Sequence, residues 1–187
     1  DWEKAIFYYQ KAIYIKPNLT RVYRNLAKVC QCTEKEELAT EYTYKAIILE
    51  PESATAIEHL NIGKKLLELN KIEAAINCYR NAVKINPNLL AGYQNLGELL
   101  AKNGELESAL IVLHQGIKID AKNPRCYYLL GEVLQKQGQY ELAISAYSHG
   151  IELKPENHSF HKKLGDVWQK MGKLDVAISC YEKAIEI

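Results

Sequence analysis

The chain has 187 residues, of which 48% are hydrophobic and 25% are charged, and its 24 basic and 23 acidic side chains leave a formal net charge of +1. This composition is ordinary for a globular protein and excludes an intrinsically disordered or collagen-like chain. A net charge so close to zero gives no overall attraction to nucleic acid or to an anionic membrane, so such a role would need a local cluster of charge.

Neither a membrane-spanning segment nor a secretory signal can be recognised. The longest uninterrupted apolar run covers residues 109–113, whereas a membrane-spanning helix needs roughly 20. Asp1, Glu3 and Lys4 break the stretch where a signal peptide would have its apolar core. We therefore expect a soluble, cytoplasmic protein that does not bind membranes.

The five cysteines do not form a disulfide or zinc pattern. They are odd in number and contain no C-x-x-C pair, and Cys30 and Cys32 would point to different sides of a helix. We expect free thiols, as is typical of a reducing cytosol, with Cys30 and Cys78 among the packing residues.

A period of 34 residues organises the whole sequence. Prolines that follow an apolar helical stretch are spaced by 34, by 36 and by twice 34: Pro17, Pro51, Pro87 and Pro155. Aligned on them, small residues fall into two columns, one of alanine (Ala39, Ala75, Ala109, Ala143, Ala177) and one of glycine (Gly63, Gly97, Gly131, Gly165, with Ala27 once). Tyr79, Tyr147 and Tyr181 form a third column, in which Thr43 and Leu113 are exceptions. A fixed period of this length is the signature of a repeat protein.

In chain order, the alignment predicts one helix in residues 1–19, the second helix of a truncated repeat, and then five helix pairs. The pairs occupy residues 20–53, 56–89, 90–123, 124–157 and 158–187, and the two extra residues fall at 53–55. Apolar residues recur at helical spacing in each pair, as at Leu96, Leu99 and Leu100. Glycines at 104, 138 and 172 can take the positive φ that ends a helix.

The turn inside the first pair has no glycine. We expect Thr33 to cap the next helix there, with Glu36 completing a capping box.

The columns resemble the tetratricopeptide repeat, whose pattern combines aromatic, Leu-Gly, Ala and Pro positions. The resemblance covers the whole chain and implies an all-α, right-handed superhelical solenoid of antiparallel helix pairs, like the arrays of bacterial and transferase-associated proteins. Neither end carries a recognisable polar capping helix, so we expect a piece of a longer array. Trp2, Ile6 and Tyr9 are then candidates for an exposed apolar face through which solenoid ends could self-associate.

No catalytic, metal or cofactor site can be recognised. Gly92 and Gly97 have the spacing of a phosphate-binding loop, but Glu98 follows where lysine is required. His158 and His161 are three residues apart, whereas a zinc-binding helix spaces its histidines by four. A basic stripe in every repeat, expected for reading single-stranded nucleic acid, is also missing. We expect no enzyme, no cofactor and no nucleic-acid partner.

Three asparagines stand where the resemblance places the inner, concave face of the array: Asn25, Asn61 and Asn95. Leu129 and Lys163 replace them in the last two pairs. An amide both donates and accepts, so it can pair with the N–H and the C=O of an extended peptide. This resembles the asparagine ladder of the transferase that attaches N-acetylglucosamine to proteins. The alternative is that these amides only hydrate the helix or bond a neighbouring unit.

Basic residues cluster on the same face of the first pair: Arg21, Arg24 and Lys28, with Lys64 at the position of Lys28 in the second pair. Arg24 and Lys28 repel each other at a spacing of four, which favours an acidic peptide as partner. A solvated face, or a glutamate from the next helix, is the alternative. The carboxylate clamp of related chaperone-binding arrays is rejected, because Lys28 replaces its asparagine, and Ala91 and Asn95 replace two basic residues.

In the last three pairs an acidic residue precedes a lysine by four positions: Glu98–Lys102, Glu132–Lys136 and Asp166–Lys170. We expect the acidic residue and the lysine of each pair to neutralise each other within one helix.

The sequence thus favours a non-catalytic scaffold that binds an extended peptide or protein segment in its concave groove. Two other hypotheses stay open. The array could recruit substrates for a larger enzyme of glycosyltransferase type, or it could be a structural array that self-associates.

Overall fold

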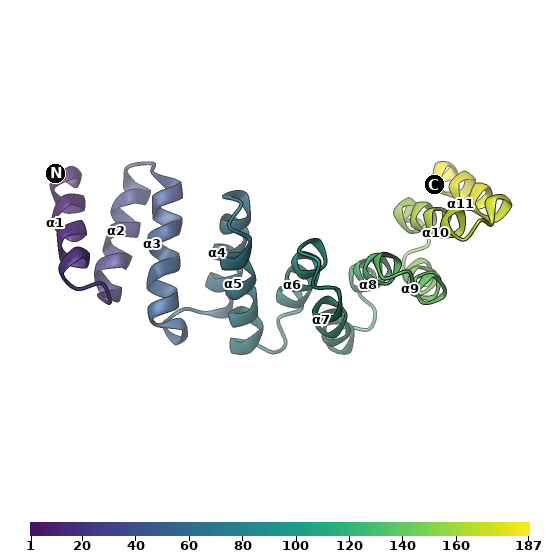
Figure 1. Cartoon of the computed structure of the whole chain (residues 1–187), viewed down its shortest axis with the longest axis horizontal. Coiled ribbons are helices and arrows are strands. Elements are labelled where there is room, and N and C mark those ends of the chain that lie inside the picture. Colours follow the sequence, from purple (N-terminus) through teal and green to yellow (C-terminus); the bar gives the residue numbers. More distant parts are fainter. The chain divides into compact units, whose positions relative to one another are not determined.

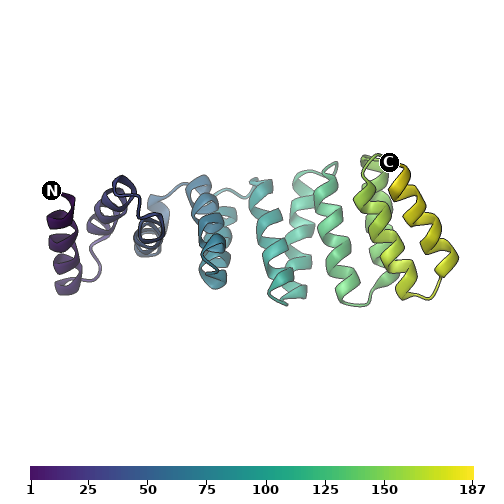
Figure 2. The same ribbon diagram turned by 90° about the horizontal axis from the view of Figure 1, so that it is seen from above.

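The computed structural model describes residues 1–187 and consists of helices without any strand (Figures 1 and 2). Helix α1 (Trp2–Ile15) is followed by α2 (Thr20–Cys32), α3 (Glu36–Leu49), the short 3-10 helix η1 (Pro51–Ser53), α4 (Ala56–Glu68), α5 (Ile72–Ile85), α6 (Leu90–Lys102), α7 (Leu106–Ile119), α8 (Pro124–Lys136), α9 (Tyr140–Leu153), α10 (His158–Lys170) and α11 (Leu174–Glu186). The expected all-α array of helix pairs is confirmed. The helices form two compact units, Asp1–Gly92 and Tyr93–Ile187.

Glycine and tyrosine hold the two helices of a pair together. A methyl group added to Gly131 on α8 would lie only 2.3 Å from the ring of Tyr147 on α9. The same holds for Gly63 beneath Tyr79, at 2.5 Å. Such a distance is far inside van der Waals contact, so only glycine allows the ring to lie flat against the first helix. The residues of the glycine column and of the tyrosine column therefore contact each other between the two helices of a pair.

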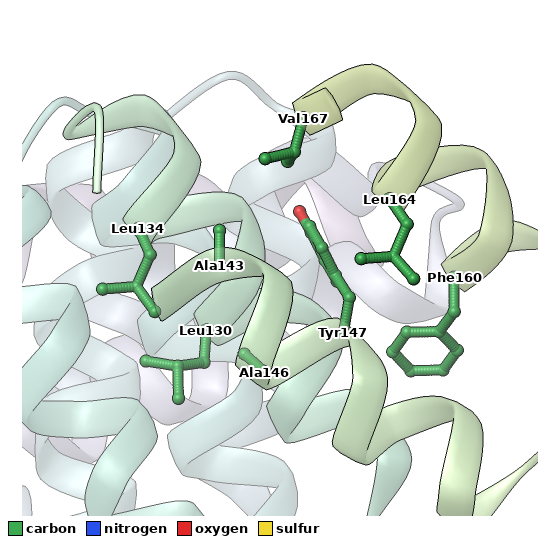
Figure 3. Packing of buried hydrophobic residues seen from close by; sticks show 8 residues of the cluster. All are labelled: Leu130, Leu134, Ala143, Ala146, Tyr147, Phe160, Leu164 and Val167. Atoms are coloured by element: carbon green, nitrogen blue, oxygen red, sulfur yellow. The ribbon is translucent and has the colours of Figure 1, made fainter. Parts of the chain in front are cut away.

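In the second unit, aromatic rings join one helix pair to the next (Figure 3). Tyr147 and Phe160 lie side by side among aliphatic side chains, with ring centroids 6.4 Å apart. The edge of Phe160 also meets Tyr128, at 5.5 Å. A methyl group on Gly150 of α9 would be 2.1 Å from the Phe160 ring. Phe160, on α10, therefore packs directly on the backbone of the preceding pair.

The turn within each pair contains one residue in the left-handed conformation. Gly104, Gly138 and Gly172 have φ of +89°, +74° and +75°, whereas the first two pairs use Glu34 and Asn70, at +58° and +56°. Glycine adopts this conformation without strain and asparagine tolerates it, whereas a glutamate is strained there. The first turn therefore does not differ in this respect although it has no glycine, since Glu34 takes the conformation of its glycine counterparts.

The expected capping box at Thr33 and Glu36 is also wrong. Thr33 follows the last residue of α2, and its hydroxyl donates to the carbonyl oxygens of Val29 (3.0 Å) and Cys30 (3.2 Å). Helix α3 begins at Glu36 and has no side-chain cap. Because Thr33 is still held by the end of α2, its hydroxyl cannot serve the helix that follows.

The two-residue insertion instead creates a capping box at the start of α4. The backbone N–H of Thr55 donates to Glu58 Oε2 (2.7 Å), and the backbone N–H of Glu58 donates to Thr55 Oγ1 (3.2 Å). Next to it, His59 is fully buried, and its Nε2 lies 3.0 Å from the carbonyl oxygen of Pro51. These contacts fix η1 and the insertion against α4.

The cysteines are free thiols, of which Cys30, Cys78 and Cys126 are buried, Cys32 is exposed and Cys180 is partly covered. Burial raises the pKa of the Cys78 thiol to about 12. The packing role expected for Cys30 and Cys78 agrees with their burial.

The exposed face of α1 differs from the expected one. Trp2 is exposed as expected, but Ile6 and Tyr9 are half-buried, because α1 contacts α2. Phe7 and Tyr8 are exposed instead, at 52% and 66%.

Candidate peptide-binding site

The three asparagines are distributed over both units. Asn25 on α2 and Asn61 on α4 belong to the first unit, and Asn95 on α6 belongs to the second. Asn61 is exposed, whereas Asn25 and Asn95 are half-buried. None of the three side chains has a hydrogen bond within the protein. Their amides are therefore not used to bond a neighbouring helix and remain able to bind a ligand.

A pocket of about 400 Å³ lies in the first unit between α2, α3 and α4. Its apolar floor is formed by Ala27, Ala46, Ile47, Ala54 and Ile62, and its polar edge by Arg24, Lys28, Gln31, Thr43, Ser53, Glu58 and Asn61. The structure thus brings together three of the predicted residues, Arg24, Lys28 and Asn61. Arg21, Asn25 and Lys64 do not line the pocket.

The sequence pointed to Arg24, Lys28 and Asn61 but not to Glu58 or to the apolar floor of the pocket. Ala54, in the insertion, follows the last residue of η1 and precedes the N-cap of α4, and this path brings it to the floor. The capping sequence Thr55-x-x-Glu58 could have indicated this turn.

The pocket edge keeps an excess of positive charge. Arg24 donates a hydrogen bond to the hydroxyl of Ser53, and its charge contributes a small part of the lowered pKa of Glu58. The main cause of that lowering is the hydrogen bonding of the Glu58 carboxylate by the backbone and hydroxyl of Thr55. Lys28 makes no ion pair, and neither do the exposed Arg21 and Lys64. Glu58, on the next helix, therefore offsets part of the cluster without an ion pair to Arg24, and Arg24, Lys28 and Glu58 together leave one net positive charge at the edge.

In the second unit, one of the expected charge pairs along a helix is present. Lys102 Nζ lies 2.7 Å from Glu98 Oε1, and Arg125 of the next pair donates to Glu98 Oε2 at 2.8 Å. Burial alone would raise the pKa of Glu98, but these two cations outweigh it and hold that pKa below its ordinary value.

The other two expected pairs are wrong. Glu132 pairs with Lys163 of the next helix pair at 2.7 Å, and Lys136 donates to the carbonyl oxygen of Ala101 at 2.9 Å. Asp166 accepts a hydrogen bond from the hydroxyl of Tyr181 at 3.0 Å. Partners on other helices replace partners one turn away: for Glu132 and Lys136 they belong to a neighbouring pair, and for Asp166 the partner is on the second helix of the same pair. Glu132, Lys136 and Asp166 thus have partners within the protein, whereas the exposed Lys170 has none.

No group of three or more His, Cys, Asp or Glu side chains is placed to hold a metal ion. None of the helices is both long enough and apolar enough to span a bilayer.

Comparison with known proteins gives the family. Models described as TPR repeat match residues 63–104 and 99–138, and models described as tetratricopeptide repeat match residues 124–157, 2–19 and 163–187. The chain belongs to the tetratricopeptide repeat family. A TPR array is a protein-interaction scaffold, and this is the general role that the family assigns to the chain.

Solved structures of the family have the same fold. The crystal structure of MamA matches with a TM-score of 0.74 and 23% identity over 89% of this chain and 90% of its own. YrrB, described as a TPR protein with an unusual peptide-binding site, matches with a TM-score of 0.69 and 20% identity over 95% of this chain and 91% of its own. Identities this low establish the fold only.

One curated protein matches in sequence. The human protein O-mannosyl-transferase TMTC3 is 24% identical over 92 residues, which is 49% of this chain. The chain spans only 10% of the length of that relative.

Proposed function

We propose that the chain is a non-catalytic scaffold that binds an extended, acidic peptide segment of a partner protein on the face formed by the first helices of its pairs. The observation that carries the proposal is the pocket of the first unit, where Arg24, Lys28 and Asn61 surround an apolar floor. The peptide-binding site named for YrrB, which shares the fold, supports it.

Each group has a separate task in this proposal. The free amides of Asn25 and Asn61 bind the N–H and C=O groups of the peptide in the first unit, and Asn95 does so in the second. Arg21, Arg24, Lys28 and Lys64 attract carboxylates. A net hydrogen bond contributes only about 0.5 to 1.5 kcal/mol, whereas micromolar binding requires about 8 kcal/mol. The amides therefore set the register of the peptide, and burial of its side chains supplies most of the affinity.

The test is selection of peptides from a random displayed library on the parent chain, followed by titration with variants. A combined Asn25→Ala, Asn61→Ala and Asn95→Ala variant should weaken all selected peptides by similar factors, because amides bind the backbone. Arg24→Glu should chiefly weaken acidic peptides, and added salt should have the same effect. Asn77→Ala, at an exposed position of α5, is the matched control. Unchanged affinity in the triple variant, with helix content intact, would refute the proposal.

A second proposal is that the array recruits substrates for a larger enzyme of glycosyltransferase type. Only the match to the human O-mannosyl-transferase favours it. The complete coding sequence decides, because a transferase domain in the same chain is required.

A further inference from the structure

The first helix pair has no tyrosine at the column position where three other pairs have one, although the rings of Tyr23 and Tyr42 meet elsewhere between α2 and α3, with centroids 6.3 Å apart. In α4–α5, α8–α9 and α10–α11, tyrosine covers a glycine: Gly63 and Tyr79, Gly131 and Tyr147, Gly165 and Tyr181. The same positions in α2–α3 hold Ala27 and Thr43, and both line the pocket. The Thr43 hydroxyl donates to the carbonyl oxygen of Ala39 at 2.7 Å, so it is already satisfied by its own helix. The pocket thus lies where the other pairs hold a phenol ring.

The hydrogen-bond partner of the missing ring is nevertheless present. Tyr147 donates its hydroxyl hydrogen to Gln135 at 3.3 Å, and Tyr181 donates to Gln169 at 3.1 Å. Each glutamine stands four residues after the glycine of its pair, and Gln31 stands four residues after Ala27. Gln31 lines the pocket and has no side-chain hydrogen bond within the protein. A polar acceptor for a phenol is therefore in place without the phenol.

We propose that this pocket binds a tyrosine side chain of a partner protein's peptide, with an acidic residue close to that tyrosine. The apolar floor takes the ring, Gln31 accepts the hydroxyl hydrogen, and Arg24 and Lys28 attract the neighbouring carboxylate. The net positive edge disfavours a lysine or arginine side chain, since Glu58 is held by Thr55. This inference rests on the proposed peptide binding and names the side chain that supplies its affinity.

The size of the expected effect follows from burial of the ring. Fully burying a large apolar side chain should make a tyrosine peptide bind about ten- to a hundredfold more tightly than the same peptide with alanine. The hydroxyl should add a preference of about two- to tenfold for tyrosine over phenylalanine. Gln31→Leu should remove the preference for tyrosine over phenylalanine and leave the preference for tyrosine over alanine.

The decisive variant fills the pocket from within. Ala27→Gly combined with Thr43→Tyr restores the residues of the other pairs and puts a ring of the protein where the peptide's ring would lie. Thr43→Ser is the matched control, because it keeps both the hydroxyl and the open pocket. The probes are the peptides selected from the random library, and short Gly/Ser peptides that carry Tyr with Glu two residues on, Phe with Glu, Ala with Glu, or Tyr with Lys.

We expect the tyrosine–glutamate peptide to bind the parent and Thr43→Ser equally and the double variant at least tenfold more weakly, with the alanine peptide unaffected. Selected peptides that bind parent and double variant alike would overturn the tyrosine pocket while the proposed peptide binding stands. A library that yields no binder would overturn both the tyrosine pocket and the proposed peptide binding. A mass that rises with concentration for the parent, and not for the double variant, would show that a second copy supplies the tyrosine and would overturn the assignment to a partner protein.

Discussion

Ala27→Gly and Thr43→Tyr made together should stabilise the first unit, although each change alone should destabilise it. Ala27→Gly places glycine in the interior of α2, which costs about 1 kcal/mol in helix stability. In Thr43→Tyr the new ring meets the methyl group of Ala27. At the corresponding glycines such a methyl group would be 2.3 to 2.5 Å from a tyrosine ring, and overpacking of this kind costs about 1 to 3 kcal/mol.

The double variant removes the clash and keeps the ring. Burial of the ring contributes about 1.5 to 3 kcal/mol, and a hydrogen bond to Gln31 about 0.5 to 1.5 kcal/mol, against about 1 kcal/mol for the glycine. We expect the double variant to be about 1 to 3.5 kcal/mol more stable than the parent. The coupling between the two positions then amounts to at least about 3 kcal/mol, the upper end of values for residues in contact.

Amide hydrogen exchange is the appropriate assay, because helix pairs in a repeat array can open separately. The free energy of opening should be compared for the amides of α2 and α3 in the parent, both single variants and the double variant. The amides of α10 and α11 in the second unit serve as an internal reference. A double variant no more stable than the parent, or a coupling near zero, would refute the idea that the pocket is the place of a missing ring.

Three further predictions concern single sites. Glu34→Gly should raise the free energy of unfolding by about 1 kcal/mol in chemical denaturation, because Glu34 has a φ of +58°; a loss of stability would contradict the strain. Thr55→Ala should cost about 1 kcal/mol at neutral pH. The backbone N–H of residue 55, which the variant keeps, is the main cause of the lowered pKa of Glu58, and the Thr55 hydroxyl adds to it. The part of the cost that comes from the hydroxyl bonding the Glu58 carboxylate is present above the unfolded pKa of about 4.3 and is lost as the pH falls through the folded pKa, so the difference between variant and parent should shrink in acid but not vanish, because the Glu58 N–H still donates to the Thr55 hydroxyl. A thiol reagent should modify the exposed Cys32 first, and Cys78, with its pKa raised to about 12, only as the chain unfolds; equal rates in the native protein would contradict the burial.

The fold could be predicted because its contacts repeat. Gly131 and Tyr147 lie sixteen residues apart, as do Gly63 and Tyr79, so one helix–turn–helix geometry explains both columns. The departures from the columns, Ala27 and Thr43, were also visible in the sequence. The pocket beside them could not be predicted, because its wall includes Ser53 and Ala54 and so depends on the backbone path of the insertion, which no period describes.

The charged contacts could not be predicted from spacing alone. Lys102 bonds Glu98 one turn away, but Lys136, at the same position of the next pair, donates to the Ala101 carbonyl instead. The energies of exposed ion pairs along a helix are a few tenths of a kcal/mol. A better-placed oxygen or cation on a neighbouring helix is enough to change the partner.

Phe160 has a consequence for how the second unit could be cut or recombined. Its ring lies on the backbone of α9 at Gly150 and touches Tyr128 and Tyr147, so the boundary between the two pairs passes through shared side chains. A truncation before α10 would expose Gly150 to water and remove the contact of Phe160 with Tyr128 and Tyr147. Grafting another repeat in its place would succeed only if that repeat carried an aromatic ring at the third position of its first helix. The repeats of this chain are consequently not interchangeable parts, even though their backbones follow one pattern.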